Sequence, residues 1–95
     1  MPLFVDIVEQ ADWYGQRSGQ ELARRWENAV EVALIRIERN PGSGARCGFR
    51  VEELQDIRRM PIEGFPKHLI LYREEGTEIT VLRVVHGARD LESLF

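Results

Sequence analysis

The stretch that decides the fold is His68-Leu69-Ile70-Leu71-Tyr72. Its apolar side chains occupy both odd and even positions, which is typical of a strand covered on both faces rather than of an exposed edge strand. A polar connection with one glycine, residues 74–77, leads into a second run, residues 79–85, that is rich in β-branched residues and also apolar on both faces. The two runs predict a β-hairpin at the centre of a sheet.

Upstream of this hairpin the sequence predicts one more strand. Residues 57–62 have strand character, and Pro61 within them favours an edge position or a β-bulge. Residues 63–66 predict a turn, whereas residues 43–55 fit a loop, a turn of helix or an irregular strand. We therefore expect a three- to four-stranded antiparallel sheet over about residues 56–90.

The first half of the chain has helical periodicity. Apolar residues recur at three- and four-residue spacing over residues 4–14, two glycines interrupt the pattern within residues 15–19, and a longer amphipathic period covers residues 22–37. Asn40-Pro41-Gly42 predicts its end. We expect an α+β fold in a single domain, residues 1–95. An antiparallel helical hairpin, about residues 3–40, packs on one face of the sheet and leaves the other face free for function.

Composition and charge exclude several classes of function. Thirteen basic against sixteen acidic side chains give a formal net charge of -3, which argues against nonspecific binding to nucleic acid. One cysteine, Cys47, and two histidines offer no zinc-ligand spacing, and no cofactor-binding motif is present, so neither a metal nor a cofactor is expected. The sequence has no run long and apolar enough to span a membrane and no signal peptide, so a cytoplasmic protein is expected.

Arg83 and His86 are the polar residues of the last strand that deserve a functional interpretation. Strand alternation places Arg83 on one face with Val81 and Val85. Because an unpaired guanidinium is costly to bury, Arg83 indicates an anion site or, more commonly, a structural salt bridge, for instance to Glu74 or Asp90. His86 has the chemistry of a general acid or base, although a hydrogen bond to a backbone carbonyl is its more common role.

A set of segments, in a fixed order and spacing, carries a resemblance over nearly the whole chain. They are Ala11-Asp12-Trp13-Tyr14, Arg25-Trp26-Glu27-Asn28-Ala29-Val30, Ile37-Glu38-Arg39-Asn40-Pro41, Ile57-Arg58-Arg59, Gly64-Phe65-Pro66, Ile70-Leu71-Tyr72-Arg73 and Val81-Leu82-Arg83-Val84-Val85-His86-Gly87-Ala88-Arg89-Asp90. Together they resemble the ParE/RelE toxin superfamily. The resemblance implies the toxin of a type II toxin–antitoxin pair of the plasmid-stabilisation type, held inactive by a cognate antitoxin encoded beside it.

Three departures from the family pattern bear on activity. Family members usually open with a strand before the first helix, where this sequence has only Met1-Pro2-Leu3. The second departure is Leu69, at a position that often carries arginine in the family. The third is Phe95, which stands roughly where the ribonuclease branch has a catalytic tyrosine.

Three functions follow as alternatives. The first is a ParE-like toxin that inhibits its target, DNA gyrase by resemblance, through binding. The second is a RelE-like ribosome-dependent mRNA endoribonuclease that uses Arg83, His86 and Arg89. The third is a truncated, non-toxic relative that retains antitoxin binding. The acidic net charge, Leu69 and Phe95 favour the first.

The partners expected by resemblance are an antitoxin and a protein target, in a homodimer or a heterotetramer with the antitoxin. The candidate binding residues share a positive charge and lie in the second half of the chain: Arg59, Lys67, Arg73, Arg83 and Arg89.

Overall fold

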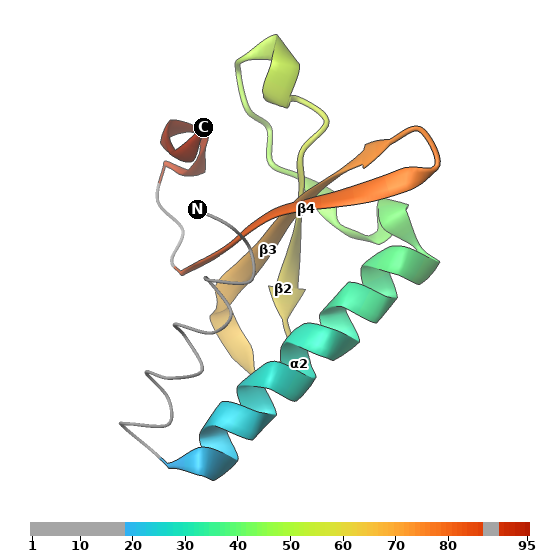
Figure 1. Ribbon diagram of the computed structural model, residues 1–95. Helices are drawn as coiled ribbons and strands as arrows, with labels where there is room; N and C mark the ends of the chain where they lie inside the picture. The colour runs from blue at the N-terminus through green and yellow to red at the C-terminus, as the bar shows by residue number, and fades with distance from the viewer. Residues whose placement is uncertain (1–18, 87–89) are drawn as a thin grey trace.

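The computed structural model describes residues 19–86 and 90–95. Helix α2 (Gln20–Arg39) is followed by a four-stranded antiparallel sheet whose strands pair in chain order (Figure 1). The strands are β1 (Ala45–Arg46), β2 (Arg58–Ile62), β3 (Phe65–Glu75) and β4 (Glu78–His86). Short 3-10 helices occupy Pro41–Ser43, Glu52–Leu54 and Leu91–Leu94. The expected combination of helix and antiparallel sheet is confirmed, whereas the first helix of the expected hairpin and the question of an opening strand lie outside the described residues.

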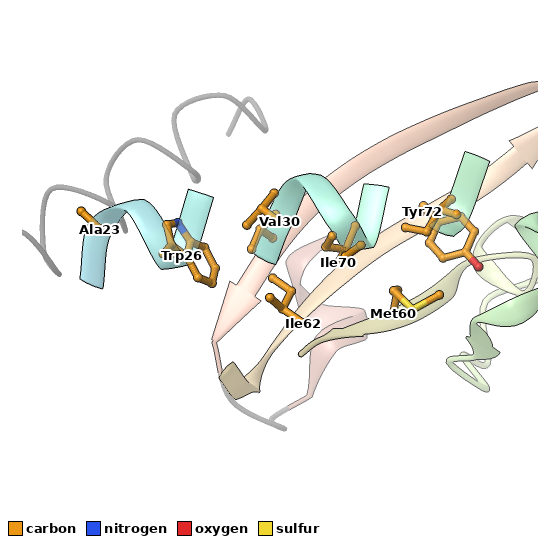
Figure 2. Packing of buried hydrophobic residues seen from close by; sticks show 10 residues of the cluster. Ala23, Trp26, Val30, Met60, Ile62, Ile70 and Tyr72 are labelled. Atoms are coloured by element: carbon orange, nitrogen blue, oxygen red, sulfur yellow. The ribbon is translucent and has the colours of Figure 1, made fainter. Parts of the chain in front are cut away.

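Helix α2 is held to the sheet by the apolar stripe that its sequence predicts. The buried residues follow one another every three or four positions, which places them on one side of the helix. Trp26 has no exposed surface, so it is a core residue. Figure 2 shows Trp26 and Val30 directed from α2 toward Ile62 and Ile70 of the sheet. The helix ends at Arg39, immediately before Asn40 and Pro41.

Strand β3 is the centre of the fold. It pairs with β2 on one side and β4 on the other. Ile70, Leu71 and Tyr72 have no exposed surface. Because side chains alternate, Ile70 and Tyr72 join the cluster beneath α2, and Leu71 joins a second cluster on the opposite face. The prediction of a central strand covered on both faces is confirmed.

The face of the sheet opposite α2 is not left free, contrary to the sequence-based expectation. Ile57, Leu71 and Val85 are buried there, beneath partly buried apolar side chains from residues 47–54 and from the strands, together with Leu91. The sequence pattern missed this layer because its apolar residues are spread over an irregular connection with neither helical nor strand periodicity.

The C-terminal 3-10 helix holds residues 49–51 in place through two hydrogen bonds and one contact between aromatic rings. The backbone amides of Arg50 and Val51 both donate to Glu92 Oε2, at 2.9 and 2.8 Å. The rings of Phe49 and Phe95 are 6.0 Å apart between centroids. One carboxylate therefore satisfies two adjacent amides that no sheet partner reaches, and it joins the end of the chain to residues 49–51.

Two irregularities interrupt the strand pairing. The first lies between Pro61 and Ile62, so the bulge predicted from the proline is confirmed. The second lies opposite Leu71 and Tyr72, where Leu82 is an extra residue in β4. The extra residue changes the alternation: Arg83 pairs with Leu71 and shares a face with Val85, whereas Val81 lies on the α2 side. The expectation that Arg83 shares a face with both valines is wrong for Val81.

The end of α2 is joined to the sheet by the Tyr72 hydroxyl. It donates a hydrogen bond to the Pro41 carbonyl at 2.7 Å and accepts one from the Gly44 amide at 2.9 Å. Arg58 Nη1 adds a hydrogen bond of 2.7 Å to the Gly44 carbonyl. Gly44 is buried against these groups: a Cβ atom there would lie 2.7 Å from the Arg59 carbonyl oxygen and would collide with the Tyr72 hydroxyl.

We predict that Gly44→Ala destabilises the protein by about 1–3 kcal/mol, because the added methyl group overfills this contact. Gly42→Ala is the matched control, since its Cβ meets only Asn40 Oδ1, at 3.8 Å. Urea denaturation followed by circular dichroism measures both variants. Equal midpoints for the two would contradict the close contact at Gly44.

Candidate functional site

Arg59 and Arg83 are brought to the same face of the sheet, on either side of Leu71. Leu71 is the pairing partner of Arg59 across β2 and β3, and of Arg83 across β3 and β4. Two strand spacings put the backbones of the two arginines roughly 10 Å apart. Arg59 is exposed and Arg83 is half-buried. The pair therefore forms a cationic row across the face opposite α2.

Lys67 and Arg73, which lie further along β3, add two cations to this row. Both have the same alternation as Leu69 and Leu71, so they lie on the same face. Lys67 is exposed. Arg73 has a structural bond of its own, because its Nη2 donates to the Glu53 carbonyl at 2.6 Å and to Asp56 Oδ1 at 2.9 Å.

The remaining candidates and partners fall elsewhere. Arg89 lies outside the described residues. Glu74, one expected salt-bridge partner of Arg83, lies three residues beyond Leu71 on β3 and so belongs to the opposite face. Asp90, the other, is exposed at the start of the last 3-10 helix and makes no ion pair among the described residues.

His86 lies on the other side of the sheet from Arg83. It pairs with His68 across β3 and β4, and the two rings are 4.7 Å apart between centroids. The His68 ring lies 4.7 Å from that of Trp26, which fixes the histidine pair on the α2 side. The structure thus brings Arg59, Lys67, Arg73 and Arg83 to one face and leaves His86 on the other.

His68, to which the sequence pattern assigned no role, has the most strongly shifted pKa among the described residues. It is 5% exposed, and burial, together with repulsion from His86, lowers its pKa from 6.5 to about 4. The imidazole is therefore neutral near pH 7. The signal was present in the sequence, because His68 shares the alternation of the buried residues Ile70 and Tyr72.

Cys47 has the character of an unreactive thiol. Burial raises its pKa, and the Arg59 guanidinium opposes that shift only partly. A thiol with a raised pKa is a poor nucleophile near neutral pH. Cys47 is partly buried against the second cluster.

The described part of the chain contains no group of three or more histidine, cysteine, aspartate or glutamate residues arranged to hold a metal ion. None of the helices described is long and apolar enough to cross a membrane.

We predict that the protein loses stability as the pH falls from about 6.5 to about 4. In this window unfolded His68 binds a proton that the folded state does not, so unfolding is favoured, by up to about 3 kcal/mol at the acid end. His68→Phe should remove this component of the pH dependence, whereas His86→Gln, which removes the repulsion, should keep most of it and complete the loss at a slightly higher pH. The measurement is the free energy of unfolding in urea across this range. Identical pH dependence in wild type and His68→Phe would refute the assignment.

Comparisons with known proteins agree with this arrangement of helix and sheet. A solved chain from the chromosomal ParDE toxin–antitoxin system of P. aeruginosa superimposes with a TM-score of 0.74 at 20% sequence identity, over 90% of this chain and 88% of that one. At that identity the likeness shows a shared fold. No curated protein sequence matches the chain.

Family membership comes from the sequence itself. Residues 5–91 match the family model of the ParE toxin of the type II toxin–antitoxin system parDE. The match covers the helical region, the whole sheet and the cationic row. The chain belongs to the ParE toxin family.

Proposed function

We propose that this ParE-type toxin inhibits DNA gyrase by binding to it, and that a cognate antitoxin neutralises it by covering part of its surface. Gyrase is the target that the family resemblance implies. The observation that carries the binding mechanism is the placement of the candidate residues: four cationic side chains share one face, and the histidine considered for proton transfer, His86, lies on the other.

That placement is poorly suited to cleaving RNA. Attack by a ribose 2′-hydroxyl on phosphorus needs a proton-transfer group and several cations that converge on one phosphate. Leu69 contributes no charge to the cationic face. Phe95 carries no hydroxyl, and its ring lies 6.0 Å from that of Phe49 between centroids. The net charge of -3 also weakens attraction to ribosomal RNA.

The same placement suits a protein partner. Arginines beside partly buried apolar side chains are typical of the energetically important centre of protein interfaces. Arg59 and Arg83 stand beside such side chains, Leu69 and Leu82, with exposed Lys67 at one end. Arg73 is already bonded to residues 53 and 56, so in this proposal it shapes the surface instead of reaching the partner.

The antitoxin supplies the regulation. By resemblance, its toxin-binding segment is disordered until it binds, so folding and binding are coupled. A homodimer and a heterotetramer with antitoxin are both compatible with a toxin of this size.

We predict that Arg83→Ala weakens binding of target or antitoxin by about tenfold or more, since truncating an arginine near an interface centre typically costs more than 1 kcal/mol. Arg24→Ala, on the exposed side of α2, should change affinity less than twofold. Titration calorimetry with each partner measures both. Equal effects would show that Arg83 is only structural.

The function itself is tested by adding purified toxin to a gyrase supercoiling reaction. Inhibition that is reversed by antitoxin, with unchanged mRNA 5′ ends in cells that express the toxin, is the expected result. New 5′ ends on mRNA with unaffected supercoiling would overturn the proposal in favour of the ribonuclease.

A further inference from the structure

A groove lies between the C-terminal half of α2 and the β3–β4 hairpin, on the side of the sheet away from the cationic row. It has a volume of about 400 Å³, within the range of sites that hold a ligand or an anchoring side chain. In Figure 1 the turn of the β3–β4 hairpin rises beside the C-terminal end of α2. We call this the hairpin groove; its lining residues used below are Leu34, Ile37, Glu38, Glu74, Glu78 and Ile79.

The floor of the hairpin groove is apolar. Ile37 is buried, and Leu34 and Ile79 are partly exposed against the main core cluster. Partly exposed aliphatic side chains at the base of a hollow gain free energy when an apolar side chain displaces water from them. The floor therefore accepts one aliphatic or aromatic anchor.

The rim of the groove is negatively charged. Glu38 comes from α2 and Glu74 from β3, and both are exposed. Glu78 lines the groove beside the hairpin turn, but it pairs with Glu75, so its side chain belongs to the opposite face. None of these carboxylates forms an ion pair within the described residues. The C-terminal end of α2, which carries the negative pole of the helix dipole, opens onto the same site.

Cations near the end of α2 do not neutralise this rim. Arg36 lies in the last turn but pairs with Glu63, at 3.7 Å between Nη2 and Oε2. Arg39 is exposed and is not among the residues that line the groove. An apolar floor inside a rim of unpaired carboxylates thus defines the complementary ligand.

We propose that the hairpin groove docks a partner segment in which an apolar anchor residue is flanked by lysine or arginine. Charge complementarity selects this occupant: an acidic segment would meet the like charges of Glu38 and Glu74, and a polar basic segment would leave the apolar floor hydrated. The site lies on the opposite face from Arg59 and Arg83. It is a second interaction surface, and it does not depend on whether gyrase is the target.

The test uses the full chain, labelled with ¹⁵N, and a short synthetic peptide in which two leucines are flanked by lysines. We expect the largest amide shift changes at Leu34, Ile37 and Ile79. Binding should weaken as salt is raised, because exposed ion pairs are screened. The same peptide with glutamates for lysines, or with serines for leucines, should not bind.

Matched variants separate the rim from general electrostatics. The double variant Glu38→Gln, Glu74→Gln should bind the lysine–leucine peptide about fivefold more weakly, as expected for the loss of two exposed ion pairs. The double control Glu27→Gln, Glu52→Gln removes the same charge from exposed positions outside the groove and should bind within twofold of wild type. Equal affinity of the two double variants, shift changes centred elsewhere, or no binding of the peptide would each overturn the proposal.

Discussion

The structure depends on β3 being buried on both of its faces. Tyr72 shows the constraint most clearly, because its ring fills the core beneath α2 while its hydroxyl bonds to the Pro41 carbonyl and the Gly44 amide. One side chain thereby sets where the helix ends relative to the sheet (Figure 2). On the opposite face, Leu71 of the same strand organises the second cluster and stands between Arg59 and Arg83.

This division gives the two faces of the sheet different chemistry. The face opposite α2 carries Arg59, Lys67, Arg73 and Arg83 around a small apolar cluster. The α2 side carries the buried histidine pair and, at the hairpin, the acidic groove. The arginines and Lys67 thus lie on one face of the sheet, and the carboxylates of Glu38 and Glu74 border the groove on the other. Under the proposed binding function, this separation lets the toxin engage two partners of different charge.

Much of the fold was predictable from the sequence because its longest elements have clear periodicity. The apolar spacing of α2, the two-sided apolar character of β3 and the proline bulge in β2 were all visible. The layer formed by residues 47–57 was not, because it has no repeating pattern and is fixed by distant contacts such as Glu92 with the amides of Arg50 and Val51. Strand alternation alone placed Val81 on the same face as Arg83. The structure places it on the other face, because the bulge at Leu82 has no recognisable pattern within a β-branched run.

The candidate site was likewise predictable only in part. The cationic residues could be named from the sequence. Only the strand register shows that Arg59 and Arg83 lie on either side of Leu71 and that His86 lies on the other face.

The most direct test of the central claim is growth of bacteria after tightly controlled induction of this chain, with and without its antitoxin. Arrest that the antitoxin relieves is the predicted result. Unimpeded growth in both cultures, with the protein present and folded, would contradict it.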